Sequence, residues 1–415
     1  MTPPSPATRS DRSHTGALVL GGNYRALGVV RSLGRRGIPV RIVKHDDARI
    51  ATLSRYAGRS LGWTPGDQRA QIEHLLALAA RHGLEGWTLI PTDDESAVLL
   101  SRGRAQLGRR YVVAAPEWDA LRWAHDKRLT YRLGLELGID QPRTSFGGDL
   151  DQLEEVVARA PAILKPAIKR GDNRFVRDKA WPVADPATLK LRYQEARAWI
   201  PVDEIMLQEL IPGDGRCQLS FGALARDGRV LASITARRTR QSPMDFGRQS
   251  TYVESIVSPD VAESGRRVIE RMAYTGLIEV EFKRDARDCR LKLLDINPRA
   301  WGWHTLGARA GVDFPYLEWR MLHGKPVAEA EGRPGVRWVR MATDVPTVAG
   351  EILAGRMSLR AHLSSLRGPL EHAMFSRDDP LPGIADIPLT GLTHLRRRVR
   401  RTRRTVSCTL AADHG

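Results

Sequence analysis

A segment late in the chain, LIEVEFKRDARDCRLKLLDINPR, carries the residue types that point most directly to chemistry. Two apolar runs flank a polar turn, which is the pattern of a β-hairpin. Asp295, Asn297 and Arg299 lie two residues apart in the second run, so an extended chain places their side chains on one face. Glu281 lies in the first run, near the height of Leu293 to Asp295 when the hairpin is closed. We expect two carboxylates, an amide and a guanidinium to converge on one sheet surface.

Such a convergence favours a metal site. Two carboxylates side by side among apolar neighbours are costly to bury unless a cation compensates them. Hard oxygen ligands select Mg²⁺, with Mn²⁺ as the alternative ion, and Mg²⁺ commonly takes one or two carboxylates together with substrate phosphates. The competing interpretation is a surface hairpin whose polar face carries charges without function.

The elements before this hairpin predict a small open α/β unit over residues 16–116. Residues 17–20 form an apolar run that ends in Gly21-Gly22, a helical pattern covers 24–33, and a second apolar run covers 40–43. Strand, glycine turn, helix and strand make one βαβ unit, which implies a parallel sheet. GGNYRALG does not match the GxGxxG of dinucleotide-binding folds, which disfavours a nicotinamide dehydrogenase. Asp94 follows a later strand end, where it either holds a substrate amine or helps to begin a helix.

The predicted pattern of helices and strands changes after residue 116. Strands separated by single helices and hairpins predict a mostly antiparallel α+β region over 117–325. A helix is expected from about Asp126 to Leu137, with Gly138 at its C-terminal end. Beyond Pro326 the signals weaken, and one amphipathic helix is expected over 352–366. Residues 1–15, rich in Pro, Ser, Thr and Arg, are expected to be a disordered lead-in without the apolar core of a secretory signal.

Composition restricts the partners. The formal net charge is +17, and the run Arg396 to Arg404 contains seven arginines. That run is either a solvated tail or a contact to an anionic membrane surface or polymer. No aromatic residues are interleaved with it, which disfavours specific nucleic-acid binding. The three cysteines are far apart in the sequence, as expected for a cytoplasmic protein that is at most peripheral at the inner membrane face.

The hairpin resembles the metal-binding hairpin of the ATP-grasp superfamily, in the carboxylate–amine ligase branch that includes the carbamoyl-phosphate synthase large subunit and D-aspartate ligase. The resemblance implies that Glu281, Asp295 and Asn297 hold magnesium at the phosphates of ATP, and that Arg299 faces the transferred phosphoryl group. Asp295 stands where the family usually has Glu. Its side chain is one methylene shorter, so one firmly held ion is expected rather than two.

Three upstream segments resemble the nucleotide contacts of the same superfamily. Lys127 opens a helix where the family has its first phosphate-binding lysine, and Lys165 in PAILKP resembles the second. LQELIPG resembles the strand that meets the adenine. There the resemblance implies contacts from the following residues: Gln208 or Glu209 to the exocyclic amine, the Glu209 and Ile211 backbones to the ring edge, and Asp214 to the ribose.

Basic and aromatic residues around the hairpin are candidates for catalysis and substrate binding. Arg238 and Arg240 lie in a cation-dense segment where the superfamily places a basic residue, and a solvated basic loop is the alternative. Trp301, Trp303 and His304 directly follow Arg299 and are expected to shape the substrate pocket. For His304 the alternatives are a catalytic base and a packed, hydrogen-bonded histidine.

Together these features imply a pre-ATP-grasp α/β domain at 16–116, ATP-grasp subdomains at 117–205 and 206–325, and a C-terminal extension at 326–415 with an arginine-rich tail. In the first domain, Gly22 would bind part of the acceptor substrate or only turn tightly. The implied activity is ATP-dependent joining of a small carboxylate to an amine through an acyl-phosphate, and many relatives form homodimers. The alternatives are a carbamoyl-phosphate-synthase-like or carboxylase-like enzyme and a non-catalytic adaptor on an anionic surface.

Overall fold

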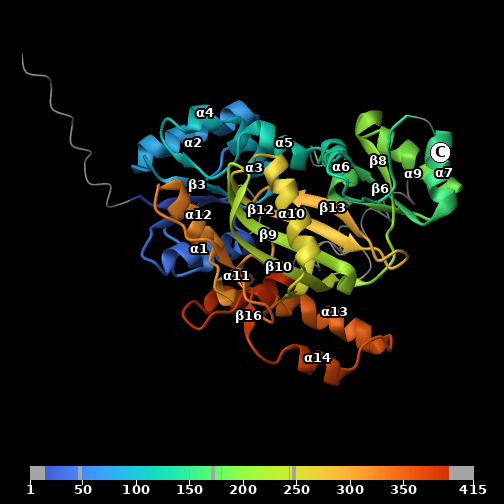
Figure 1. Ribbon diagram of the computed structural model, residues 1–415. Coiled ribbons are helices and arrows are strands. Elements are labelled where there is room, and N and C mark those ends of the chain that lie inside the picture. The colour runs from blue at the N-terminus through green and yellow to red at the C-terminus, as the bar shows by residue number, and fades with distance from the viewer. Residues whose placement is uncertain are drawn as a thin grey trace, which may run out of the picture.

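The computed structural model describes residues 15–44, 49–148, 150–169, 173–178, 180–242, 244 and 249–391. Three sheets succeed one another across the molecule (Figure 1). A parallel sheet with α1–α4 lies at the left, a large sheet occupies the centre, and a small sheet with α7 and α9 lies at the right. The mixed α/β and α+β architecture predicted from the sequence is confirmed.

The N-terminal sheet is wholly parallel, with strand order β2-β1-β3-β4. β1 and β3 are buried along their whole length, which explains why they are short apolar runs rather than alternating ones. The strands are β1 Ala17–Leu20, β2 Val40–Val43, β3 Thr88–Pro91 and β4 Val112–Val113. The helices are α1 Tyr24–Gly34, the 3₁₀ turn η1 Ile50–Leu53, α2 Gln68–His82, α3 Asp94–Arg102 and α4 Arg104–Leu107.

The small sheet is antiparallel, with strand order β5-β8-β6-β7. β8 extends across residue 206, where the sequence placed a boundary between subdomains, and it pairs with both β5 and β6. The strands are β5 Thr144–Phe146, β6 Ala162–Pro166, β7 Trp181–Val183 and β8 Ile205–Glu209. The helices are α5 Trp118–His125, α6 Lys127–Glu136, α7 Leu150–Arg159, α8 Arg174–Asp178, α9 Pro186–Arg197 and the 3₁₀ turn η2 Val202–Glu204.

The large sheet runs in the order β13-β12-β9-β10-β11-β15-β16, with β14 paired to β10. Its last strands come from beyond residue 326, so part of the predicted C-terminal extension completes this sheet. The strands are β9 Gln218–Arg226, β10 Arg229–Ser242, β11 Gln249–Ser255, β12 Gly276–Arg284, β13 Leu291–Asn297, β14 Ala330–Glu331, β15 Arg337–Val339 and β16 Leu370–His372. The helices are the 3₁₀ turn η3 Gly215–Cys217, α10 Pro259–Arg271, α11 Thr305–Ala310 and α12 Phe314–Leu322.

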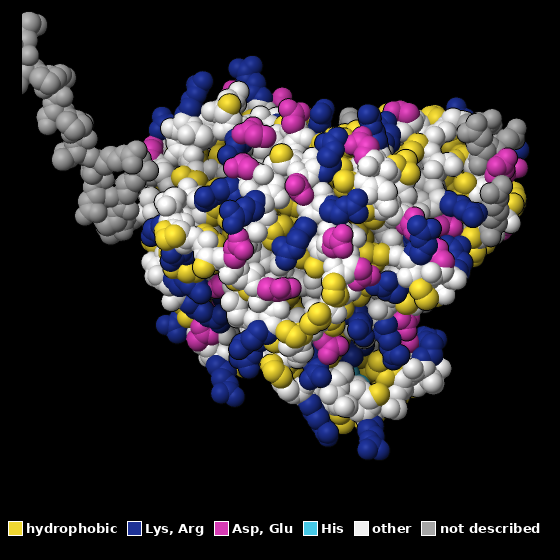
Figure 2. Space-filling view, viewed as in Figure 1, with side chains coloured by type: hydrophobic (Ala, Val, Ile, Leu, Met, Phe, Trp, Pro, Cys, Tyr) yellow, Lys and Arg dark blue, Asp and Glu magenta, His cyan; other side chains and the backbone are white. Residues whose placement is uncertain are grey.

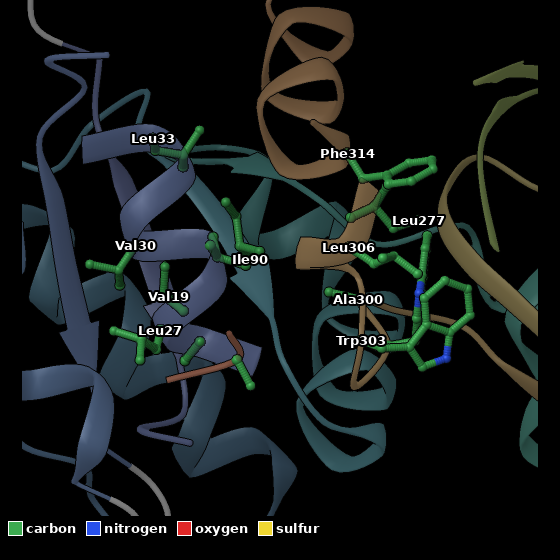
Figure 3. Packing of buried hydrophobic residues seen from close by; sticks show 14 of the residues in the cluster. Val19, Leu27, Val30, Leu33, Ile90, Leu277, Ala300, Trp303, Leu306 and Phe314 are labelled. Atoms are coloured by element: carbon green, nitrogen blue, oxygen red, sulfur yellow. The ribbon is translucent and has the colours of Figure 1, made fainter. Parts of the chain in front are cut away.

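One hydrophobic core joins the N-terminal unit to the large sheet. Val19 and Leu27 belong to the same buried cluster as Leu277 and Phe314, and Figure 3 shows the two groups on either side of one packed interior. Because burial of apolar area is the main stabilising term, this shared cluster fixes the N-terminal unit against the hairpin. The N-terminal unit is therefore placed to contribute to a site at the end of β13.

The single helix predicted over 352–366 is wrong. Two helices, α13 Met341–Leu353 and α14 Leu359–Ser365, occupy that region. Gly355, with φ +71°, lies between them in the left-handed conformation that ends helices. A buried ion pair from Arg31 to Asp379 (2.9 Å) then ties the following segment to α1.

Charges of both signs occur on the face of the molecule shown in Figure 2, where Lys and Arg side chains are interspersed with Asp and Glu. The predicted contact run Arg396 to Arg404 lies outside the described residues. Within the described part of the chain, every helix is too short or too polar to cross a bilayer.

Candidate active site

The β12–β13 hairpin brings the predicted acidic residues together. Its antiparallel register places Glu281 opposite Asp295 and Glu279 opposite Asn297. Residues two apart on a strand share a face, and directly opposed residues have neighbouring side chains. The expected height of Glu281 is therefore confirmed, and the four polar side chains form one group.

Two of the three carboxylates in this group have a cationic partner. Lys127 forms an ion pair with Asp295, and Arg238 forms one with Glu281. The Asn297 amide donates to Glu281 Oε1 at 2.7 Å. Burial alone would raise the pKa of Asp295, but Lys127 and its neighbouring lysines outweigh burial and hold that pKa below its usual value. The charges of Asp295 and Glu281 are thus compensated within the protein.

Glu279 is the member of this group that sequence reasoning missed. It is 3% exposed, accepts from Trp303 Nε1 at 2.8 Å and from Asn297 Nδ2 at 3.0 Å. Burial and the neighbouring Glu281 raise its pKa to about 7. The signal was available, because Glu279 precedes Glu281 by two residues and therefore had to share its face.

Two lysines from other elements face the hairpin. Asp126 caps α6, as predicted, and so fixes the first helical residue, Lys127, against β13. Lys165 lies on β6 of the small sheet. Burial lowers the pKa of Lys165 to about 8, although Asp295 acts in the opposite direction. The structure therefore brings Lys127 from α6, Lys165 from the small sheet and the carboxylates from the large sheet together.

Arg299 lies just beyond β13 and is held by the N-terminal unit. Its Nε donates to Asp94 Oδ1 at 2.9 Å, and its Nη2 donates to Asn297 Oδ1 at 3.1 Å. Lys169 approaches the other Asp94 oxygen at 3.4 Å. Burial opposes ionisation of Asp94, but Arg299 and Lys169 outweigh it and keep the Asp94 pKa well below its usual range. Helix capping is performed by Asp93, so Asp94 is left to orient Arg299.

The two candidate arginines of β10 have different surroundings. Arg238 contacts Glu281 and donates to Ser250 Oγ at 2.7 Å. Arg240 instead makes two 2.8 Å bonds to buried Asp344. The β10–β11 register shifts between residues 237 and 240, and such a bulge redirects side chains that regular alternation would leave on one face. The structure thus places Arg240 in a structural ion pair, not at the carboxylates.

The predicted adenine strand is β8 and the turn after it. Gln208 and Glu209 are buried; Gln208 Nε2 donates to Thr144 Oγ1 at 2.9 Å, and Glu209 Oε1 accepts from the Arg143 N–H at 3.1 Å. The remaining candidates lie in the following turn, where the carbonyl of Ile211 accepts from Lys283 Nζ at 2.7 Å and Asp214 accepts from the Arg216 N–H at 2.8 Å.

The aromatic residues after Arg299 lie in the core. Trp301, Trp303 and His304 are at most 1% exposed, and a methyl group on Gly28 would meet His304 Nε2 at 2.5 Å. Burial lowers the pKa of His304 to about 4, and its Nδ1 lies 2.8 Å from the Trp301 carbonyl. The expectation that they line a substrate pocket is corrected: apolar packing between α1 and the hairpin accounts for them, and only Trp303 reaches the site, through Glu279.

Gly22 lies in the turn between β1 and α1, where its carbonyl accepts from the Ala51 N–H at 3.0 Å. The preceding Gly21 has φ +111°, which requires glycine. A tight turn is thus explained by geometry alone.

The oxygen donors of the site fit magnesium. Glu281, Asp295 and Asn297 supply two carboxylates and an amide oxygen on one face, which is a hard-ligand set of the size that Mg²⁺ shares with phosphates. No group of three or more His, Cys, Asp and Glu side chains within the described ranges is arranged to hold a metal by itself. The donor set therefore suits an ion that also takes ligands from a bound anion.

Two cavities among the described residues lie outside this group. One, of about 10 Å³, has room for a single water and is lined by Arg299 and Glu318 among others. The other, of about 520 Å³, runs along α10 and β10. It shares no residue with the carboxylate group.

These elements define a class. A small antiparallel sheet with a lysine strand lies beside a larger, mostly antiparallel sheet whose hairpin carries the acidic group, and a parallel α/β unit precedes both. This is the ATP-grasp fold, and the chain has it.

Comparison with known proteins gives a family match over part of the chain and distant relatives over a longer part. Residues 202–343 match the family model described as ATP-grasp in the biosynthetic pathway with Ter operon. The carbamoyl phosphate synthase large chain of Gemmatimonas aurantiaca is 22% identical over 266 residues, which are 62% of this chain and 23% of that relative. The chain thus spans less than a quarter of the length of that relative.

Solved structures agree on the fold. The biotin carboxylase domain dimer of Hydrogenobacter thermophilus 2-oxoglutarate carboxylase, in complex with MgADP, ADP and bicarbonate, has a TM-score of 0.61 at 17% identity, covering 78% of this chain and 73% of that one. L-amino acid ligase from Bacillus licheniformis has a TM-score of 0.58 at 13% identity, covering 74% of each chain.

Proposed function

We propose that the chain is an ATP-dependent carboxylate–amine ligase that forms an amide or peptide bond through an acyl-phosphate and releases ADP and phosphate. The observation that carries the proposal is the convergence of Glu281, Asp295 and Asn297 with Lys127 and Lys165. Cations and acidic oxygen donors drawn from two sheets are what a metal-bound polyphosphate needs.

In this proposal ATP lies between the small sheet and the hairpin. Glu281, Asp295 and Asn297 hold Mg²⁺ or Mn²⁺, and the metal, when bound, withdraws charge from the phosphates. Lys127 and Lys165 contact the phosphates. The adenosine contacts are assigned to the β8 region, at Gln208, Glu209, Ile211 and Asp214.

The chemistry then needs two displacements. An oxygen of the substrate carboxylate bonds to the γ-phosphorus while the bond to ADP breaks. Next, the amine nitrogen bonds to the acyl carbon, the bond to phosphate breaks, and the amine loses a proton. Arg299 and Arg238 stabilise the charge on the transferred group, because fixed cations in a site with little water need not reorganise during reaction.

A carbamoyl-phosphate-synthase-like or carboxylase-like reaction is the second candidate, favoured by the match to a carbamoyl phosphate synthase chain. It shares the first displacement and differs in its carboxylate, which would be bicarbonate. The proposed substrates are otherwise a small carboxylate and an amine. Homodimer formation, an anionic-surface contact through Arg396 to Arg404 and a cytoplasmic location are further proposals of lower priority.

The test is an ADP-release screen with Mg²⁺ or Mn²⁺ against pairs of amino acids, sugar acids and amines, with a separate bicarbonate arm. We expect one pair to stimulate ADP release, and Asp295→Asn and Glu281→Gln to abolish it in folded protein. Asp288→Asn is the matched control, since Asp288 lies in the turn of the same hairpin and pairs only locally with Lys292 at 2.9 Å.

Different outcomes separate the candidates. Stimulation by bicarbonate without an amine would favour the carboxylase-like reaction. Full activity in Asp295→Asn would refute the site assignment. Function in cells that survives Asp295→Asn but not removal of residues 392–415 would support the adaptor instead.

A further inference from the structure

The strand order of the N-terminal unit predicts a binding crevice beside Asp94, the residue that contacts Arg299 of the site. In the order β2-β1-β3-β4 the chain connections leave β1 and β3 in opposite directions, so a crevice opens at their carboxyl ends. Ligands of open α/β sheets bind at this switch point. The two strand ends are joined there by Thr92 Oγ1, which donates to the Leu20 carbonyl at 2.7 Å.

Two charged residues stand at this crevice, and they differ in how they are paired. Asp94 begins α3 and is bonded to both Arg299 and Lys169. Arg25, in the first turn of α1, has a buried Nε with no hydrogen-bond acceptor among the described residues. Burial and the neighbouring Arg299 lower the pKa of Arg25. The Nε of the Arg25 guanidinium is thus a buried donor without an acceptor among the described residues, beside the charges of Asp93 and Asp94.

The backbone N–H groups of Arg25 and Ala26, at the start of α1, are not available to bind an anion. Asn23 Oδ1 already accepts from the N–H groups of Arg25 and Ala26, at 2.9 and 3.3 Å. The Arg25 Nε is therefore a donor that remains available, and Arg25 lies close enough to Asp94 and Arg299 to interact with their charges.

We infer that this crevice binds an anionic group, a carboxylate or a phosphate, on the amine substrate, and that Arg25 is the residue that recognises it. That the ligand is the amine substrate rests on the proposed ligase function, whereas the anion site itself does not depend on that function. An arginine fork matches the two oxygens of either group, and this chemistry is shared by both sources. Binding there would place the rest of the substrate toward Arg299.

The cost of an unpaired cation separates this role from a structural one. Arg25 is partly buried and its Nε has no acceptor among the described residues, so an apolar residue of similar length should be tolerated at position 25. If Arg25 had a structural role, its replacement by an apolar residue would instead lower the stability. Arg25→Met therefore distinguishes the two roles before any ligand is identified.

The experiment measures thermal midpoints of the full chain with increasing inorganic phosphate or acetate, balanced with chloride to constant ionic strength. Wild type, Arg25→Met and Lys165→Met are compared, because phosphate also binds wherever the nucleotide phosphates do. Arg110→Met is the matched control: Arg110 pairs with Glu85 at 2.7 Å at the opposite end of the sheet.

We expect one anion to raise the wild-type midpoint more than chloride does. The shift should persist in Lys165→Met and Arg110→Met and vanish in Arg25→Met, whose midpoint without anion should be at least that of wild type. The anion that raises the midpoint more, acetate or phosphate, indicates whether the site binds a carboxylate or a phosphate group. The inference fails if Arg25→Met keeps the shift, if only Lys165→Met loses it, or if Arg25→Met is markedly less stable than wild type.

A kinetic arm connects the site to the reaction. With an amine found by ADP release, Arg25→Met should raise the KM of that amine by about 10- to 100-fold, the loss expected for one charge-assisted contact, and leave the KM of ATP unchanged. An active amine that carries no anionic group would overturn the inference. Absence of ADP release with an Arg25-dependent anion shift would instead count against the ligase proposal alone.

Discussion

Glu318 offers the most quantitative test of how the hairpin is supported. This α12 residue is 3% exposed and accepts from the Leu277 N–H, at the start of β12, through Oε1 at 3.1 Å. Burial raises its pKa to about 8 from an ordinary 4.5, and the bond from Leu277 only partly opposes that effect. We predict that Glu318→Gln stabilises the protein at alkaline pH.

The direction follows from proton binding. Below pH 4.5 the carboxyl is protonated in both folded and unfolded chains, so it adds no pH dependence. Between pH 4.5 and about 8 only the folded chain retains the proton, and the free energy of unfolding falls as pH rises. The loss is about 1.4 kcal/mol per pH unit, or up to about 5 kcal/mol over the whole range. Glutamine keeps the acceptor for Leu277 and never ionises, so it escapes this loss.

Urea unfolding at pH 5 and pH 8 measures the effect. The free energy of unfolding of Glu318→Gln should lie close to that of wild type at pH 5 and exceed it by several kcal/mol at pH 8. Glu263→Gln on the exposed side of α10 is the control and should behave as wild type at both values. A gain at pH 8 below about 0.5 kcal/mol, the size of an ordinary surface substitution, would refute the reasoning.

Three further predictions concern other charged groups. Asp379→Ala leaves Arg31 buried without its partner, so urea unfolding should show a loss of about 3–5 kcal/mol. Arg240→Met should lower stability by a similar amount, because Asp344 is completely buried, while calorimetry of the folded variant should show unchanged ADP affinity. Lys165, with its pKa at about 8, is largely uncharged at pH 9, so ADP affinity should fall by up to about tenfold between pH 7 and 9 in wild type and stay flat in Lys165→Arg.

Local sequence patterns predict the β12–β13 hairpin and the residues that share its face. They do not predict contacts between residues that are far apart in the sequence. Glu281 and Asp295 are linked by one short turn, so alternation alone fixes which face they share. No local pattern links Asp94 to Arg299, 205 residues later, and that contact became visible only when the N-terminal unit was packed against β13. Lys127 and Lys165 were found by resemblance to a known family, since a single lysine has no spacing signal.

The errors have equally local causes. The sequence predicts Arg238 and Arg240 alike, because both lie in the cation-dense segment where the superfamily places a basic residue. A bulge in β10 that depends on its partner strand separates them. Trp303 and His304 follow a charged residue in the sequence, which suggested a pocket. Their side chains instead pack in the interior shared by α1 and the large sheet. Tertiary packing of this kind cannot be predicted from the residues next to them in the sequence.

The ion pairs of the site bear on how binding would proceed. Asp295 is held by Lys127 and Glu281 by Arg238, so these two partly buried charges are balanced in the protein alone. Under the proposed function, a metal would take over both carboxylates and release the two cations toward the phosphates. Each buried charge then exchanges one partner for another, and none is left uncompensated, which avoids the several kcal/mol that an unpaired buried ion costs. Metal and nucleotide should consequently bind as a pair: either alone would leave Lys127 and Arg238, or the two carboxylates, without a counter-charge.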